Sequence, residues 1–205
     1  MVRYADGMRQ YAVNEIFYSL QGEGVRAGTP NFFLRFAGCN LSCKQETHGF
    51  DCDTEFISSR KMTLDEISDE LAVLSRECKW IVLSGGEPGL QIDGELIAGL
   101  HGLGYRLAVE TNGSITLPEG LDWITVSPKV AEHAIRQTTA NEVKYVRGYG
   151  QGIPRTVVEA EHYVISPAFE GENLPKRTLE WCIRLVKENP AWRLSVQQHK
   201  IWSIR

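Results

Sequence analysis

Apolar runs of strand length alternate along this chain with stretches of helical periodicity, and this alternation restricts the possible folds most strongly. The expected strands lack strict two-residue alternation, which is typical of strands buried on both faces; they cover residues 31–37, 80–83, 105–109, 123–126, 142–146, 163–165 and 194–196. Helices are expected to begin at Thr63, where Thr63 and Glu66 form a capping-box pattern, and to cover residues 93–103 and 178–188. The alternation predicts an α/β fold with a mostly parallel sheet.

Length and composition fit one globular domain, which we expect to cover residues 1–205. The chain is 42% apolar and 23% charged, which excludes disordered and fibrous classes. Its apolar runs fall far short of the roughly 18 residues that a membrane-spanning helix needs, and residues 1–20 show no signal-peptide pattern. The net charge of −4 argues against broad nucleic-acid binding. We therefore expect a cytoplasmic protein with no membrane or direct nucleic-acid partner.

Three of the five cysteines lie close together, in the long loop after the first expected strand. Cys39, Cys43 and Cys52 fall within fourteen residues, whereas Cys78 and Cys182 stand alone and are expected to be small buried side chains. In a reducing compartment, a local cluster of thiolates indicates zinc or iron–sulfur ligation before disulfides. A structural zinc site needs a fourth ligand, for which His48 is available, whereas three cysteines on an iron–sulfur cluster leave one iron open. The three cysteines alone are compatible with both a zinc site and an iron–sulfur cluster.

Polar sequences that contain Gly or Pro follow three of the expected strands. They are Ser84-Gly-Gly-Glu-Pro88, Glu110-Thr-Asn-Gly113 and Ser127-Pro-Lys129. Glycines at a strand end let a ligand approach the main chain, and Glu87 offers a carboxylate to an ammonium group. Each sequence alone is compatible with an ordinary turn. Because the carboxyl ends of parallel strands meet at one edge of the sheet, together they predict a pocket above the three thiolates.

In this order, the cysteine triplet and the three strand-end sequences resemble radical S-adenosylmethionine enzymes. A narrower resemblance comes from Glu15-Ile-Phe-Tyr-Ser-Leu-Gln-Gly-Glu-Gly24, from Arg35 with Ala37-Gly-Cys-Asn-Leu41, from Cys52-Asp-Thr54 and from Gln197-Gln-His-Lys200. These blocks resemble the 7-carboxy-7-deazaguanine synthase family, and the resemblance extends from about residue 11 to the C-terminus.

The resemblance implies a lyase that converts 6-carboxy-5,6,7,8-tetrahydropterin into 7-carboxy-7-deazaguanine with loss of ammonia, in 7-deazapurine (queuosine-type) biosynthesis. It implies a [4Fe–4S] cluster that cleaves S-adenosylmethionine to a 5′-deoxyadenosyl radical, and a Mg²⁺ ion. The radical takes a hydrogen from the substrate and returns one after rearrangement. The resemblance also implies an open, partial (β/α) barrel, a homodimer, and an electron donor such as flavodoxin or ferredoxin.

The family's binding residues transfer to matching positions of this sequence. The implied metal ligands are Cys39, Cys43 and Cys52 for the cluster and Thr54 for Mg²⁺. The implied S-adenosylmethionine site comprises Asp51, Cys52, Asp53, Gly85, Gly86, Glu87, Ser127, Pro128 and Lys129. The implied substrate site comprises Leu20, Gln21, Gly22, Glu23, Arg35, Ser84, His199 and Arg205. Arg35 is also compatible with a structural ion pair, and His199 with a structural histidine.

The spacing in the cysteine triplet differs from the family's usual pattern. Eight residues separate Cys43 from Cys52, where the family usually has two, and His48 lies among them. Loop closure over six more residues costs little entropy, so cluster binding stays compatible with this spacing. Two alternatives remain open: a different radical enzyme, such as an activase that installs a glycyl radical on a partner protein, and a zinc-bound module without catalytic activity.

Overall fold

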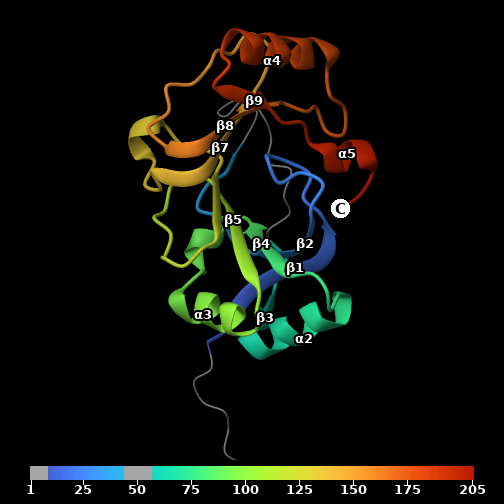
Figure 1. Ribbon diagram of the computed structural model, residues 1–205. Coiled ribbons are helices and arrows are strands. Elements are labelled where there is room, and N and C mark those ends of the chain that lie inside the picture. Colours follow the sequence, from blue (N-terminus) through green and yellow to red (C-terminus); the bar gives the residue numbers. More distant parts are fainter. Residues whose placement is uncertain (1–8, 44–56) are drawn as a thin grey trace, which may run out of the picture.

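A nine-stranded sheet forms the frame of the computed structural model, which describes residues 9–43 and 57–205 (Figure 1). The strands are β1 (Tyr11–Leu20), β2 (Pro30–Phe36), β3 (Arg60–Met62), β4 (Trp80–Gly85), β5 (Arg106–Thr111), β6 (Trp123–Val126), β7 (Thr139–Arg147), β8 (Glu159–Pro167) and β9 (Trp192–Leu194). Their order is β3-β1-β2-β4-β5-β6-β7-β8-β9, with parallel pairing from β2 to β9. β3 and β9 do not pair, so the sheet is open, and the predicted α/β class with a mostly parallel sheet is confirmed.

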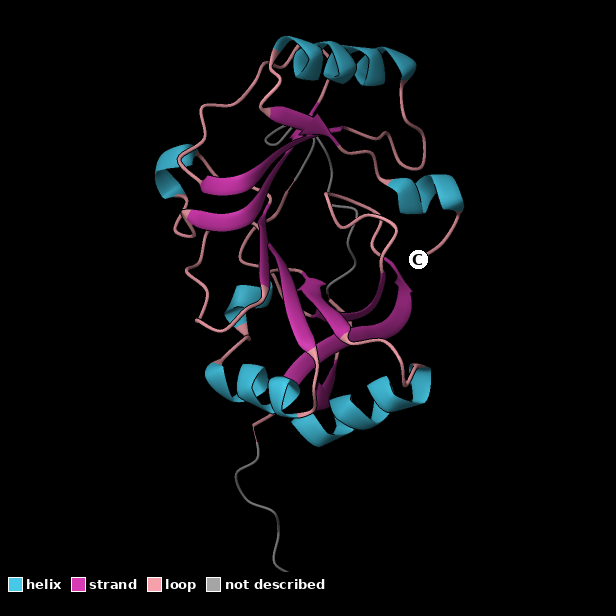
Figure 2. Cartoon of the chain, in the orientation of Figure 1, coloured by secondary structure: helices cyan, strands magenta, loops and turns pink. Residues whose placement is uncertain are grey.

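Helices α2 (Leu64–Leu74), α3 (Gly94–Gly102) and α4 (Lys176–Glu188) lie on the outer side of the curved sheet, whereas the short α5 (Gln198–Trp202) lies beside its opening (Figure 2). Single 3₁₀ turns are η1 (Pro88–Leu90) and η2 (Glu132–Ala134). The predicted capping box is present at α2, where the Thr63 hydroxyl accepts from Glu66 N and the Glu66 carboxylate accepts from Thr63 N. Asp93 caps α3 in the same way. No helix in the described ranges is long and apolar enough to cross a membrane.

Two apolar cores lie between the sheet and these helices. The larger core joins β1, β2, β4 and β5 to the buried faces of α2 and α3, including Ile67, Leu71 and Leu96. The smaller core lies under α4, where Cys182 packs against residues of β6, β7 and β8. Cys78 lies in the larger core, so both solitary cysteines are buried side chains as predicted.

Three strands differ from the sequence-based expectation. β1 and β3 were not expected, and β9 covers residues 192–194 where a strand over 194–196 was expected. β1 pairs antiparallel with both β2 and β3, and it carries polar residues such as Asn14 and Glu15 between its buried apolar positions. The sequence of β1 therefore contains no long continuous apolar run that would indicate a buried strand. Ser195 N donates to Ile165 O (2.9 Å), so pairing to β8 continues one residue past β9.

The connection between β1 and β2 meets the C-terminal segment on the concave side of the sheet. Gln21 N donates to Thr29 O and Gly28 N to Gln21 O, both at 2.8 Å, which closes residues 21–29 into a compact loop. Gln198 N at the start of α5 donates to Gly22 O (2.9 Å). Segments nearly the whole chain apart therefore lie side by side, next to the carboxyl ends of the parallel strands.

Candidate functional site

A cleft of about 1220 Å³ opens at the carboxyl ends of the parallel strands, between the 21–29 loop and the C-terminal segment. Its lining includes most of the described residues that sequence analysis placed in a site: Leu20, Gln21, Gly22, Glu23, Arg35, Cys39, Cys43, Ser84, Gly85, Gly86, Ser127, Lys129, His199 and Arg205. Glu87 and Pro128 are not among the lining residues. The predicted ligands Asp51, Cys52, Asp53 and Thr54, together with His48, lie outside the described residues.

The cysteine loop enters the cleft directly after β2. Cys39 and Cys43 are half-buried there, and Leu41 N donates to Cys39 Sγ (3.4 Å). Main-chain N–H groups that donate to sulfur are a regular feature around iron–sulfur ligands. Two thiols four residues apart in sequence, at the edge of a large cleft, fit a cluster with room beside it for a small molecule.

The glycines at the end of β4 bring main chain next to this loop. Gly85 has a φ of +111°, and a side chain at this position would overlap the main chain of Phe36. A Cβ on Gly86 would overlap the carbonyl of Gly38. Gly86 N donates to Phe36 O (3.1 Å) and Glu87 N to Gly38 O (3.0 Å). The two glycines therefore hold the end of β4 against the start of the cysteine loop, with main-chain groups facing the cleft.

Glu87 lies beneath these glycines, with no exposed surface. Its carboxylate accepts hydrogen bonds from Asn112 N (2.7 Å), Thr111 Oγ1 (2.8 Å) and Gly89 N (2.9 Å). Burial raises the pKa of Glu87, and the three donors act against this rise. The carboxylate thus joins the ends of β4 and β5. Its predicted contact with the methionyl ammonium stays a prediction.

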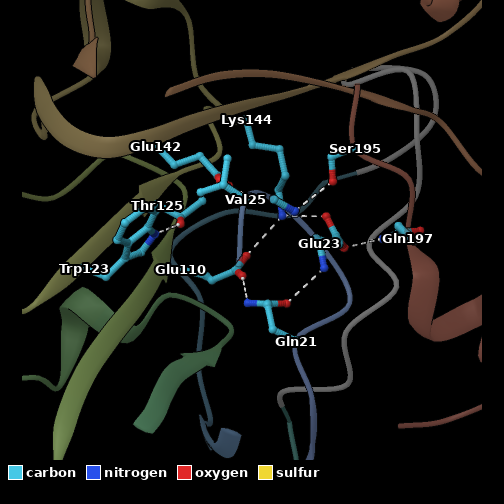
Figure 3. A network of polar contacts seen from close by, with 11 residues as sticks. Gln21, Glu23, Val25, Glu110, Trp123, Thr125, Glu142, Lys144, Ser195 and Gln197 are labelled. Carbon is cyan, nitrogen blue, oxygen red and sulfur yellow. Dashed lines mark hydrogen bonds and ion pairs between the residues drawn. The ribbon is translucent and has the colours of Figure 1, made fainter. Parts of the chain in front are cut away.

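The opposite side of the cleft contains a buried ion-pair network (Figure 3). Lys144 Nζ of β7 lies 2.6 Å from Glu23 Oε2 and 3.1 Å from Glu110 Oε2. The second oxygen of each carboxylate accepts from a side-chain amide at 2.8 Å, Gln197 for Glu23 and Gln21 for Glu110. All five side chains line the cleft.

Burial would raise the pKa of Glu23, but the charge of Lys144 and the hydrogen bonds from Lys144 and Gln197 outweigh it and lower this pKa to about 2. Burial would likewise lower the pKa of Lys144, and the neighbouring carboxylates Glu110 and Glu23 instead raise it above its usual range. Both groups are therefore charged at neutral pH. Burial raises the pKa of the nearby Glu142, whose carboxylate accepts from Val25 N (2.7 Å).

Close packing explains both glycines of the Gln21-Gly-Glu-Gly24 block. A Cβ on Gly22 would overlap the imidazole of His199. Gly24 has a φ of +70°, and a Cβ there would overlap the carboxylate of Glu142. The block is therefore the contact surface for the C-terminal Gln-Gln-His-Lys block and for β7, besides closing the hairpin between β1 and β2.

Arginines lie at the mouth of the cleft. Arg35 Nη1 donates to Glu15 Oε1 (2.9 Å), and its guanidinium lies 5.2 Å from the centre of the Phe17 ring. Arg205 pairs with the other oxygen of Glu15 and also lies over Phe17. Arg35 is thus in a structural ion pair and also lines the cleft, so the two sequence-based interpretations of it are compatible.

Sequence analysis missed Lys144 and Gln197 as site residues and considered Glu110 only as part of a strand-end sequence. A signal existed for Lys144, because a lysine between Val143 and Tyr145 in a buried strand needs a charged partner. Gln197 stood in the C-terminal block that carried the resemblance. The partners of both residues come from distant segments, so only the fold identifies them.

Comparisons with known proteins agree with this geometry. A family described as "4Fe-4S single cluster domain" matches residues 20–139. The 7-carboxy-7-deazaguanine synthase of Bacteroides thetaiotaomicron is 42% identical over 94% of this chain and 98% of its own length. That of Bradyrhizobium diazoefficiens is 39% identical over 95% of this chain and 99% of its own length. The crystal structure of QueE from Escherichia coli superimposes with a TM-score of 0.71 at 23% identity, over 93% of this chain and 95% of that one, which shows the same fold.

Proposed function

Because the chain belongs to the 7-carboxy-7-deazaguanine synthase family, we propose that it converts 6-carboxy-5,6,7,8-tetrahydropterin into 7-carboxy-7-deazaguanine with loss of ammonia. It is a lyase of the radical S-adenosylmethionine type, acts on a small pterin, and uses a [4Fe–4S] cluster. When bound, the cluster and S-adenosylmethionine supply one-electron radical chemistry at the substrate. The product enters 7-deazapurine biosynthesis of the queuosine type.

The observation that carries the proposal is one cleft lined both by the cysteine loop and by the Gln21-Gly-Glu block. We infer that Cys39 and Cys43, with Cys52, ligate the cluster. The main chain of Gly85 and Gly86 would receive the methionyl part of the cofactor, and the rest of its proposed site is Asp51, Cys52, Asp53, Glu87, Ser127, Pro128 and Lys129. A small molecule bound across this cleft would touch both sides.

The proposed substrate site rests on hydrogen-bond acceptors and on cationic side chains that line the cleft. Gln21 and Glu23 offer amide and carboxylate groups to the donors and acceptors of the pterin edge. Arg35 presents a guanidinium that suits the substrate carboxylate. Leu20, Gly22, Ser84, His199 and Arg205 complete the proposed wall. These residues bind and orient the pterin and displace water from it.

Further elements of the proposal follow from the family alone. We assign Thr54 to Mg²⁺, a hard cation that prefers oxygen ligands. Electrons would come from a flavodoxin or ferredoxin, and the working unit would be a homodimer of one-domain chains in the cytoplasm. Pulldown with reduced flavodoxin and light scattering of the purified enzyme test the donor and the dimer separately.

One anaerobic reaction tests the activity itself. Iron-loaded protein would be mixed with S-adenosylmethionine, 6-carboxytetrahydropterin, Mg²⁺ and dithionite, and the products analysed by mass spectrometry. We expect 7-carboxy-7-deazaguanine, with the cofactor largely conserved. Formation of 5′-deoxyadenosine alone would contradict the assigned substrate and favour another radical enzyme. Tight zinc with no iron would contradict radical chemistry altogether.

A further inference from the structure

A buried lysine stands at the centre of the substrate side of the cleft. The side chain of Lys144 is 7% exposed, and its ammonium lies between the carboxylates of Glu23 (2.6 Å) and Glu110 (3.1 Å). Lysine is almost never buried unless it is paired. Two carboxylates that contact the same group repel each other unless that group carries a positive charge.

Each carboxylate is also held at its second oxygen. Gln197 Nε2 donates to Glu23 Oε1 and Gln21 Nε2 to Glu110 Oε1, both at 2.8 Å. Glu23 belongs to the 21–29 loop, Glu110 to β5, and Gln197 immediately precedes α5. Lys144 therefore ties together three segments that are remote in sequence, and it does so at residues that line the cleft (Figure 3).

We propose that Lys144 is a positioning residue that fixes the Glu23 and Glu110 carboxylates as a pair of hydrogen-bond acceptors for the amino-pyrimidinone half of the pterin. This inference rests on the proposed function, because that half of a pterin carries an exocyclic amine and a ring N–H. Two fixed acceptors favour a ligand with these donors over one that presents a carbonyl oxygen instead. Lys144 acts through the carboxylates and needs no contact with the substrate.

The charged groups around Glu23 determine how ligand binding depends on pH. The charged and titratable groups that face it are Lys144 and Glu142 of β7, Glu110 of β5 and His199 of α5, with Arg26 lining a small cavity beside it. With Lys144 present, Glu23 stays ionised down to about pH 2. Without it, burial is no longer opposed by that charge, and the pKa of Glu23 rises. Ligand binding then weakens as the pH falls, because a protonated carboxyl no longer accepts both donors.

The test uses two ligands that are not turned over. The proposed product, 7-carboxy-7-deazaguanine, carries the 2-amino group, and its counterpart 7-carboxy-7-deazaxanthine carries a 2-oxo group. Dissociation constants for both would be measured by calorimetry on cluster-loaded protein with S-adenosylmethionine, between pH 6 and 8. The variants are Lys144→Met and Lys144→Arg. Lys187→Met, an exposed lysine of α4, is the matched control.

The native enzyme and Lys187→Met should prefer the 2-amino ligand at least about tenfold, with a flat pH profile. Lys144→Met should bind that ligand on the order of tenfold to a hundredfold more weakly, lose most of the preference, and bind more weakly still at pH 6. Lys144→Arg keeps the charge and should keep most of the preference. A purely structural role would weaken both ligands equally and leave their ratio unchanged.

Two results separate failure of this inference from failure of the proposed function. If the native enzyme binds neither ligand, the proposed function is wrong. If it binds with the expected preference and Lys144→Met keeps both the ratio and the flat profile, the role of Lys144 is wrong. Should Lys144→Met not fold, Lys144→Gln, which is also uncharged but keeps a polar end, takes its place: a retained ratio with a flat profile would overturn the proposal, and a ratio near one with weaker binding at pH 6 would support it.

Discussion

The two sides of the cleft are built on different physical principles. On the cysteine side, Gly85 and Gly86 place main chain against main chain, and the buried Glu87 accepts three hydrogen bonds from neighbouring donors. On the side that we assign to the substrate, called the pterin side below, the charges of Lys144 and Glu23 meet in a buried pair. The cysteine side therefore depends on steric fit, whereas the pterin side depends on charge balance. Mutations that add atoms should harm the first side most, and mutations that remove charge the second.

Removing a cluster ligand should have the largest effect. Cys39→Ala deletes one of the proposed thiolate ligands, so we expect iron content near zero and no measurable product. Iron analysis and the visible absorbance of the reconstituted protein measure this directly. Cys182→Ala is the matched control, because that thiol is buried under α4 and should cost only stability, about 1 kcal/mol. Full iron loading of the Cys39→Ala variant would show that Cys39 is not a cluster ligand.

Adding one methyl group on each side should sharpen the comparison. In Gly86→Ala the new Cβ meets the main-chain carbonyl of Gly38, which cannot move alone. We therefore expect the free energy of unfolding to fall by about 2 kcal/mol and the KM for S-adenosylmethionine to rise. In Gly22→Ala it meets the side chain of His199, so the KM for the pterin should rise instead.

Gly94→Ala is the control for this pair, because a Cβ there meets open space. Urea unfolding measures the stability, and initial rates with each substrate varied measure the two KM values. If both variants raised both KM values equally, an added methyl group on one side of the cleft would also disturb binding on the other side.

Removing one charge should break only the pterin side. Glu23→Gln keeps the shape of the side chain and leaves Lys144 with one anionic contact fewer, so we expect a roughly tenfold higher KM for the pterin. Iron content and the KM for S-adenosylmethionine should not change.

The same variant has a defined pH dependence of stability. The pKa of Glu23 is lowered from 4.5 to about 2, so its ionised form stabilises the fold fully above pH 4.5 and loses this contribution as the pH falls toward 2. The difference in free energy of unfolding between the native chain and Glu23→Gln should therefore shrink below about pH 4.5. A difference that grows on acidification would contradict the ion pair.

The smallest effect should come from a site outside both sides. Thr63→Ala removes the capping box of α2 and should lower the free energy of unfolding by about 1 kcal/mol. Neither KM should change, because α2 packs against β1 and α3, away from the cleft lining. A changed KM would show that stability and binding are coupled through the sheet.

The sequence predicts those parts of the fold whose pattern is local. The cap at Thr63, the apolar face of α2 and the continuous apolar runs of β4 and β6 are each visible within a short window. β1 is not, because its polar positions hide a strand whose partners, β2 and β3, are both antiparallel to it. The expected strand over 194–196 was displaced because pairing with β8, a tertiary contact, fixes the ends of β9.

The same distinction holds for the site. The cysteine cluster and a strand-end motif placed Cys39 and Gly86 at the cleft, and the family resemblance placed Glu23 there. The ion pair of Lys144 joins Glu23, which is 121 residues away, and no local pattern reports such a partner. Glu87 shows the converse case: its motif was visible, but only the fold reveals the hydrogen bonds from the end of β5.

The contact between the 21–29 loop and the C-terminal segment has a consequence for how the chain folds during translation. Ser19 Oγ donates to the carbonyl of Arg205, 186 residues later, and Gln197 reaches back to Glu23 across 174 residues. During translation, β1 and its neighbours are exposed long before these partners leave the ribosome. We therefore expect the nascent chain to pair β1 with β2 long before Gln197 can reach Glu23, so that a translation product truncated before residue 197 would carry the cysteine residues but lack these contacts.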